Sequence, residues 1–471
     1  MKKNFLAGGF RRSRWLVLVA VLGAVAFVDS SRAAFLDPGA TGTKIRAQQP
    51  DRELRDLLRQ IDQGNLENTV NKLVSFGTRH TSSSQTDPNR GIGAAISWVT
   101  SQMQTFAAAS NGHMTVQQQS FVQPASSRIP VPTTITNVIA TLQGSTNPER
   151  IYVVAAHLDS RVTDVFDLTD DAPGADDDAS GVAAVMELAR VLATVQPKAT
   201  LVFSIVDGAE QGLFGSAFEA AQLKAAGADV EAMFSDDTVG SSTADDGTHD
   251  RHTLRLFAEG VPTAATSAQV SFLQAFGGEV DGVSRQLGRF VKSVAENSST
   301  DMHIRIIYRR DRVLGGSDHI SFLQQGYPAA RFSEPHENYA HEHQNTQVVN
   351  GVQFGDLVEF LDFAYLERVA KVNLATMWSL SQAPGTPKNV QILVPGFTND
   401  TDLTWTRGAE PDLAGYEVVW RETTDPDWTH VIPVGDVTSA HLPDFSKDNV
   451  FFGVRAVDSD GHASPVAFPS P

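Results

Sequence analysis

Four short and almost wholly apolar runs, separated by segments with helical spacing, restrict the fold of this chain most strongly. The runs are NVIATLQG (137–144), RIYVVAAH (150–157), ATLVFSIVD (199–207) and YPAARFSE (327–334). Between them, residues 180–195 repeat their apolar positions at helical intervals, and Ser180 can cap that helix. An earlier helical stripe covers residues 91–103. Apolar strands that alternate with helices predict an α/β fold, in which helices flank a mostly parallel mixed sheet.

Histidines and carboxylates follow these runs, at the ends of strands where such sheets bind ligands. They occur in AAHLDS (155–160), GADDDASG (174–181), DGAEQGLFGS (207–216), SDDTVG (235–240) and SEPHENYAHEHQNT (333–346). Singly, each has an ordinary interpretation, such as a strand-end histidine or an acidic helix N-terminus. Together, the adjacent carboxylates repel one another unless a cation lies between them, which favours a metal centre. Because the chain has no cysteine, its metal ligands can only be His, Asp or Glu.

These motifs, with GGSDHISFLQQGYPA (315–329), resemble the family-28 metallopeptidases, which are secreted aminopeptidases with two zinc ions bridged by an aspartate. The likeness extends over roughly residues 55–375, with the motifs in family order. It implies a zinc-peptidase fold over residues 51–378, two zinc ions as cofactors and a peptide as substrate.

The resemblance also implies a role for individual residues. His157 is expected to bind one zinc, Asp177 to bridge both ions, and Glu210 to bind the zinc opposite; Asp237 matches the aspartate of the second ion. The last ligand is His341 by the spacing usual in the family, or His343 by the local pattern HEHQN. Ser317, Asp318 and His319 are expected to support the site from behind.

Asp159 follows His157 by two residues. Its carboxylate can hold the second ring nitrogen of that histidine and fix its tautomer, so we expect Asp159 to orient His157. The stretch GTRHT (77–81) also resembles an early family motif, but we interpret it as a turn followed by the start of a helix.

One position departs from the family pattern. The family has two consecutive glutamates at 209–210, of which the first is the general base, and this chain has Ala209 and Glu210. The alternative alignment makes Glu210 the base and Gln211 the ligand, which a metal tolerates less well. Asp178 and Asp207 are conceivable substitutes for the base. Three hypotheses follow: a zinc exopeptidase, weakened at this position; a catalytically impaired relative that binds metal and recognises peptides or surfaces; and a di-zinc hydrolase of non-peptide amides.

The two ends of the chain carry different signals. Basic residues followed by WLVLVAVLGAVAF (15–27) and SRAA (31–34) predict a cleaved signal peptide over 1–34, with an uncleaved anchor as the less favoured alternative. A linker is expected at 35–50. The mature protein is then secreted or periplasmic and free of the membrane.

Residues 383–471 change to short strand-like runs and resemble a fibronectin type III domain, with Trp405, Tyr416, Phe451 and Phe452 as its expected core. Such a domain can serve as a spacer or bind a protein or polymer surface. The formal net charge of −18 argues against a nucleic-acid partner.

Overall fold

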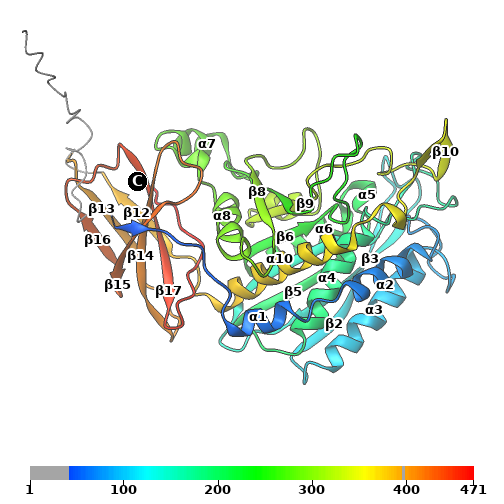
Figure 1. Ribbon diagram of the computed structural model, residues 1–471, viewed down its shortest axis with the longest axis horizontal. Helices are drawn as coiled ribbons and strands as arrows, with labels where there is room; N and C mark the ends of the chain where they lie inside the picture. The colour runs from blue at the N-terminus through cyan, green and yellow to red at the C-terminus, as the bar shows by residue number, and fades with distance from the viewer. Residues whose placement is uncertain (1–41, 395–397) are drawn as a thin grey trace, which may run out of the picture.

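The structure, a computed structural model, describes residues 42–394 and 398–471. The expected signal peptide lies outside these ranges. No helix within them combines the length and the hydropathy needed to cross a bilayer. An α/β domain and a smaller β sandwich lie side by side along the long axis of the molecule (Figure 1).

An eight-stranded mixed sheet forms the centre of the larger domain, as the apolar runs predicted. Its strand order is β2-β3-β5-β4-β6-β9-β7-β8. The strands are β2 (Met114–Gln123), β3 (Thr133–Leu142), β4 (Asn147–His157), β5 (Ala199–Val206), β6 (Asp229–Asp236), β7 (Thr253–Phe257), β8 (His303–Ile307) and β9 (Ala329–Ser333). Strands β5, β4, β6 and β9 run parallel to one another, so their carboxyl ends meet at one edge of the sheet.

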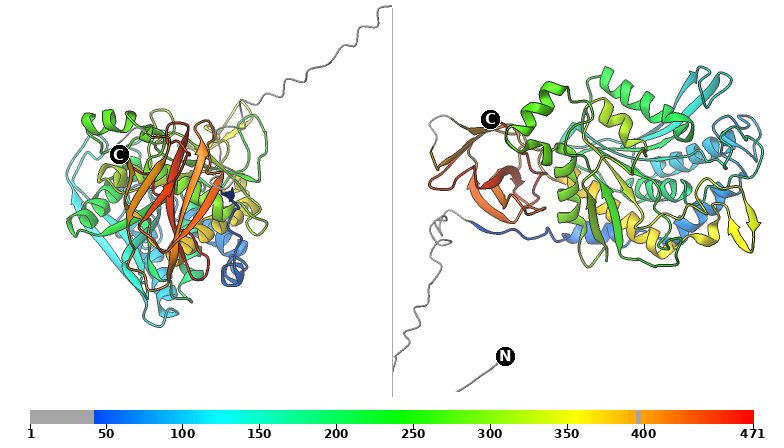
Figure 2. Two further views of the ribbon diagram at one scale, coloured as in Figure 1. Left: turned by 90° about the vertical axis from the view of Figure 1, so that its left-hand side faces the viewer. Right: turned by 90° about the horizontal axis from the view of Figure 1, so that it is seen from above.

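Helices cover both faces of this sheet (Figure 2, right). One face carries α1 (Arg52–Leu58), α2 (Gln63–Val74), α3 (Ile92–Ala108), α4 (Ala179–Leu192), α8 (Val283–Ala295) and α10 (Phe363–Gln382). The other face carries α6 (Phe214–Ala225) and α9 (His319–Gln324). Shorter elements are α5 (Ala209–Gly212), α7 (Ser267–Gln274), the 3-10 turns η1 (Gly278–Val280) and η2 (Val358–Phe360), and the hairpin of β10 (Gln347–Val349) and β11 (Val352–Phe354).

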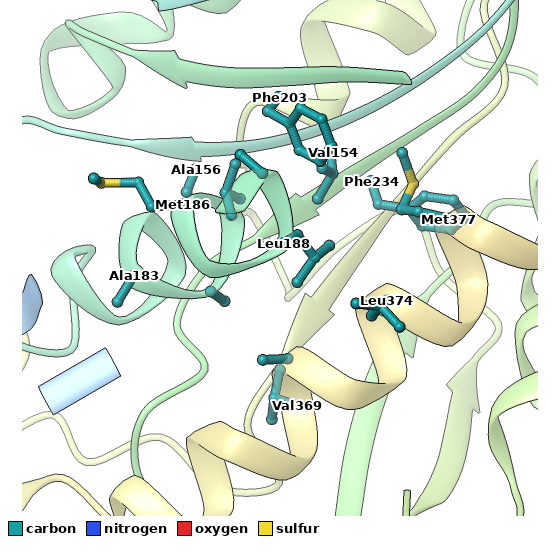
Figure 3. Close-up of a cluster of buried hydrophobic side chains, with 14 of the residues drawn as sticks. Val154, Ala156, Ala183, Met186, Leu188, Phe203, Phe234, Val369, Leu374 and Met377 are labelled. Atoms are coloured by element: carbon teal, nitrogen blue, oxygen red, sulfur yellow. The ribbon is translucent and has the colours of Figure 1, made fainter. Parts of the chain in front are cut away.

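Alternation along β4 explains why this strand is apolar throughout. Val154 and Ala156 point toward α4 and α10, as Figure 3 shows, and Val153 and Ala155 pack on the opposite face with α6 and α9. Because both faces are buried, no position between Ile151 and Ala156 is fully exposed. The strand therefore delivers His157 to the edge of the sheet on a rigid support.

The start of α4 differs from the sequence expectation in its cap. Asp178 is the N-cap, and its Oδ1 accepts a hydrogen bond from the main-chain N–H of Gly181 at 3.1 Å. Ser180 lies inside the first turn and donates to the carbonyl of Asp176. A carboxylate two residues earlier reaches the free N–H groups of the helix better, so the prediction of Ser180 as cap was wrong.

The C-terminal residues form a sandwich of two sheets, with strand orders β12-β13-β16 and β1-β15-β14-β17. Its strands are β12 (Lys388–Leu393), β13 (Thr401–Thr406), β14 (Leu413–Glu422), β15 (His430–Gly435), β16 (Ser439–Leu442) and β17 (Val450–Asp458). Trp405, Tyr416 and Phe452 lie in its core, as expected from the sequence. Phe451 instead packs on Phe468 and lies beside Gly277, which follows α7.

A strand from the N-terminal end of the described chain completes the second sheet. β1 (Thr43–Lys44) pairs antiparallel with β15, and the N–H of Ile45 donates to the carbonyl of Thr429 at 2.8 Å. The prediction of an irregular linker over 35–50 was therefore wrong for these residues. Pairing at an open sheet edge uses main-chain groups, which carry no side-chain pattern in the sequence.

Candidate metal centre

Five side chains converge where the parallel strands end. His157 is the last residue of β4, Glu210 lies on α5 directly after β5, and Asp237 follows β6. The other two come from loops: Asp177 precedes α4, and His343 follows β9. The segments that carry the five side chains all lie at the same edge of the sheet, because the strands before them run parallel.

Asp177 lies between two groups of ligand atoms. Its Oδ1 is 3.0 Å from Nε2 of His157, and its Oδ2 is 2.7 Å from Nε2 of His343. One group contains His157, Asp177 and Asp237, and the other contains Asp177, Glu210 and His343, with the ligand atoms of each group within 4.8 Å of one another. Asp237 therefore groups with His157, and Glu210 groups with His343. The geometry offers two metal positions that share one carboxylate.

The chemistry of the donor set fits divalent metal ions. Two neutral imidazoles and three carboxylates are ligands suited to zinc in a catalytic site. Oε1 of Glu210 is buried and accepts no hydrogen bond in the described part of the chain, although Nε2 of His343 lies 2.8 Å away. A buried carboxylate oxygen without a donor is costly, and a cation at this position would remove the cost.

Of the two alternatives for the last ligand, the structure brings His343 into the site. Its Nε2 faces both Asp177 and Glu210. His341 instead stacks on Phe360, with ring centroids 3.6 Å apart. The structure thus groups His343 with Asp177 and Glu210, and not the histidine favoured by the spacing usual in the family, because the loop after β9 sets which ring turns inward.

Asp159 supports the site differently from the expectation. The ring nitrogen Nδ1 of His157 lies 2.9 Å from the main-chain carbonyl of Asp159, while the nearest carboxylate oxygen is 3.7 Å away. The carboxylate accepts hydrogen bonds from the N–H groups of Gly208, Ala209 and Glu210. Asp159 thus fixes His157 through its backbone and fixes the turn that carries Glu210 through its side chain.

The turn that carries Glu210 also shows which of its residues faces the two metal positions. Glu210 contacts the ligand group, whereas Gln211 bonds through Oε1 to Thr81 and through Nε2 to His80. This arrangement fits the alignment in which Ala209 occupies the position of the base. It does not fit the alternative in which Gln211 is a ligand.

The two carboxylates considered as substitutes for the base have structural partners. Asp178 accepts from the N–H groups of His157 and Gly181. Asp207 is fully buried, and its Oδ2 accepts from the N–H of Thr136. Burial raises the pKa of each carboxyl well above its usual value. Neither side chain belongs to the group of ligand atoms.

The three residues expected to support the site, Ser317, Asp318 and His319, contact different partners. Ser317 bonds to Ser235 of β6, and His319 faces the carbonyl of Arg310. Asp318 is fully buried, and burial raises the pKa of its carboxyl to about 6. None of the three belongs to either ligand group.

Three arginines that the sequence did not single out hold the site together. Arg331 donates to Asp237, and Nε of Arg161 lies 2.8 Å from Oε2 of Glu210. Arg79 is buried and donates to the carbonyls of Leu158, Pro173 and Gly174, so it joins the beginning of the loop between β4 and α4 to the later part that carries Asp177.

Arg79 and Thr81 belong to the GTRHT stretch, which was wrongly interpreted as the start of a helix. The next helix along the chain, α3, begins only at Ile92. Resemblance to an early motif of the family was the one signal in the sequence that could have identified this stretch.

A second cluster of acids and histidine lies far along the chain, at Asp458, Asp460 and His462. Nζ of Lys198, from the larger domain, lies 3.0 Å from Asp458 and 3.8 Å from Asp460. The ammonium group already supplies the positive charge that these carboxylates require. We therefore assign this cluster to the contact between the two domains.

Comparison with known proteins agrees with this arrangement. The model of peptidase family M28 matches residues 137–352, the range that holds all five candidate ligands. A protein of Pyrenophora tritici-repentis, described as a probable zinc metalloprotease, is 50% identical over 461 residues, covering 98% of this chain and 95% of its own length. The chain belongs to peptidase family M28.

Other relatives align with both domains of this chain, and solved structures share its fold. A probable zinc metalloprotease of Pyricularia oryzae is 49% identical over 436 residues, which cover 91% of this chain and 87% of the relative. A crystal structure of LapA from Legionella pneumophila aligns with a TM-score of 0.50 and 19% identity, covering 72% of this chain and 78% of that one. The latter likeness concerns the fold alone.

Proposed function

We propose that this protein is an exported zinc exopeptidase of the aminopeptidase type, which hydrolyses peptide bonds at a centre of two zinc ions. The observation that carries the proposal is the position of Asp177, whose two oxygens face the histidines of two separate ligand groups. Membership of peptidase family M28 and relatives described as probable zinc metalloproteases support the reaction class and the metal.

Each ligand has a defined place in this proposal. His157 and Asp237 would hold one ion, Glu210 and His343 the other, and Asp177 both. A pair of zinc ions supplies Lewis acidity, which polarises a peptide carbonyl and makes water a stronger acid. The residues around the ligands orient them: Asp159 holds the turn of Glu210, Arg331 holds Asp237, and Arg161 holds Glu210.

The site lacks a proton acceptor at position 209, where the family has its general base. Ala209 has no group that can accept a proton, and a positioned general base contributes about 10²- to 10⁴-fold to the rate. The peptidase is therefore expected to be slow, with the metal ions and the binding of the peptide responsible for the remaining acceleration.

The proposal is tested with the purified full chain, zinc and aminoacyl chromogenic amides. We expect two zinc ions per chain, slow release of the chromophore, and loss of turnover in a chelator that zinc restores. A matched pair of variants separates the site from general damage: Asp177→Asn should lose zinc and turnover, whereas Asp170→Asn, on an exposed loop, should retain both. Turnover that persists without bound metal would exclude this function.

Ala209 also favours a second candidate function, a relative that binds metal and recognises peptides without cleaving them. Under this alternative the chain binds two zinc ions and a peptide, but no aminoacyl amide or peptide is hydrolysed. The same experiment includes non-peptide amides, which are the substrates expected under the third hypothesis from the sequence.

The sandwich domain is proposed to be a fibronectin type III-like module. Its strands form one sheet of three and one sheet of four, and β1 is the edge strand added to the sheet of four. This division and the core that contains Trp405 and Tyr416 support the proposal. Export is proposed from the basic and apolar N-terminal residues 1–34. Mass spectrometry of the secreted protein, with a new N-terminus near residue 34, would test that cleavage.

A further inference from the structure

Arg161 contacts the two ligands that belong to the second metal position alone. Its Nε lies 2.8 Å from Oε2 of Glu210, and its Nη2 lies 2.6 Å from Nδ1 of His343. The side chain is 16% exposed, so solvent screens its charge only partly. This guanidinium is therefore a fixed positive charge beside the place where a dication would bind.

The first metal position has a different electrostatic environment. Arg331 contacts Asp237, but it is fully buried and is also paired with Asp311 at 3.0 Å. The Arg331 guanidinium thus faces two carboxylates, and its charge is shared between Asp237 and Asp311.

The second position has less compensation. Arg128 donates to the main-chain carbonyl of Glu210 at 2.8 Å, which adds a second guanidinium on this side. Oε1 of Glu342 lies 3.8 Å from Nδ1 of His343, and that carboxylate is itself paired with Arg312 at 3.1 Å. Two guanidinium groups, those of Arg161 and Arg128, thus contact Glu210 directly.

The hydrogen bond to His343 acts in the same direction. A histidine that binds a metal through one ring nitrogen usually donates the N–H of the other to an acceptor. The group 2.6 Å from Nδ1 of His343 is Nη2 of Arg161, and a guanidinium has no acceptor atom. Arg161 and a metal ion therefore make incompatible demands on the same imidazole.

We propose that Arg161 weakens the second metal position, built by Glu210 and His343, relative to the first, built by His157 and Asp237. The inference rests on the proposed two-zinc centre. It assigns Arg161 a positioning role, because the residue acts through the two ligands it contacts. At limiting zinc, the first position then fills before the second.

The test is a zinc titration of the full chain in competition with a fluorescent chelator of known affinity, with zinc stoichiometry and the two dissociation constants as the readout. In Arg161→Met, the second zinc should bind at least about tenfold more tightly, the size typical of changes around metal ligands. The first dissociation constant should stay within about twofold, because Arg161 does not contact His157 or Asp237.

Two variants control for charge and for folding. Arg161→Lys retains the charge without the planar fork, so its second zinc should bind more weakly than in Arg161→Met. Arg407→Met removes one surface arginine from the sandwich domain, where it pairs with Asp436, and should leave both constants unchanged. Equal melting temperatures would show that the variants are folded.

The outcomes separate this inference from the proposed function. If the wild-type chain binds two zinc ions and Arg161→Met binds the second no more tightly, the role of Arg161 is refuted. Equal gains in Arg161→Met and Arg161→Lys would also refute it, because the charge would then have no part. If neither wild type nor any variant binds a second zinc, the two-zinc centre itself fails.

Discussion

Oδ2 of Asp177 lies 2.7 Å from Nε2 of His343, while the other oxygen of the same carboxylate faces His157. The two histidines are 186 positions apart in the sequence; His157 ends strand β4, and His343 lies in the loop after β9. One carboxylate between two imidazoles is the arrangement that a pair of bridged metal ions requires. The proposed centre of two zinc ions depends on this position of Asp177 between the two histidines.

The choice between the two candidate histidines can be tested directly. We predict that His343→Ala lowers the zinc content from two ions to one and reduces turnover of an aminoacyl amide at least about 100-fold, because the second ion loses a ligand. His341→Ala should retain two ions and most of the activity. It should destabilise the protein by about 1 kcal/mol, because the ring stacks on Phe360.

The absence of a base at position 209 leads to a gain-of-function prediction. Ala209→Glu should raise kcat by about 10²- to 10⁴-fold without changing the zinc content. Ala209→Gln has a similar size and no proton acceptor, so it should give no gain. An Ala209→Glu variant that binds two zinc ions and is no faster would contradict the alignment of this turn with the family.

How far the sequence predicted the site depended on the kind of contact. Apolar runs that end in polar residues indicated the segments that hold His157, Asp177, Glu210 and Asp237, and the resemblance to the peptidase family selected these residues within the segments. Arg79, Arg161 and Arg331 were missed, because each acts through residues far along the chain. Nothing near an arginine in the sequence indicates whether it points to solvent or to a buried carboxylate.

The fold shows the same limit. Local apolar patterns predicted strands β3, β4, β5 and β9 and helices α3 and α4, and the structure agrees with this α/β arrangement. They did not single out the parallel strand β6. Strand β1 could not be predicted, because it has two residues and pairs with β15, which lies almost 400 positions later. The choice of His343 over His341 likewise depends on a loop whose path no local pattern fixes.

The contact between the two domains contains a buried cluster of charges. Asp281 is fully buried and pairs with Arg289 of α8 and with Arg421 of the sandwich domain. Asp281→Asn would leave two buried guanidinium groups with one neutral partner, so we predict a loss of about 3 kcal/mol in the free energy of unfolding. Asp427→Asn breaks a more exposed pair with Lys292 and should cost less than about 1 kcal/mol. Denaturant unfolding measures the free energy of unfolding of both variants. Equal losses would contradict the assignment of Asp281 to a buried cluster of charges at the domain contact.

The domain contact should also depend on pH through His462. Its hydrogen bond to Asp458 raises the pKa of His462 above the usual value. A raised pKa stabilises the folded protein below the unfolded value of about 6.5, and this contribution disappears as the pH rises through the folded value. Wild type should therefore exceed His462→Asn by about 0.5 kcal/mol at pH 5.5, a figure reduced for partial exposure, and by nothing at pH 9. A difference that grows with pH would contradict this sign.

The most direct test of the two-ion centre is X-ray diffraction from crystals grown with zinc, with anomalous data collected on both sides of the zinc edge. The account predicts two peaks that disappear below the edge, one between His157 and Asp237 and the other between Glu210 and His343, each beside Asp177. A single peak, or peaks away from these five side chains, would contradict it.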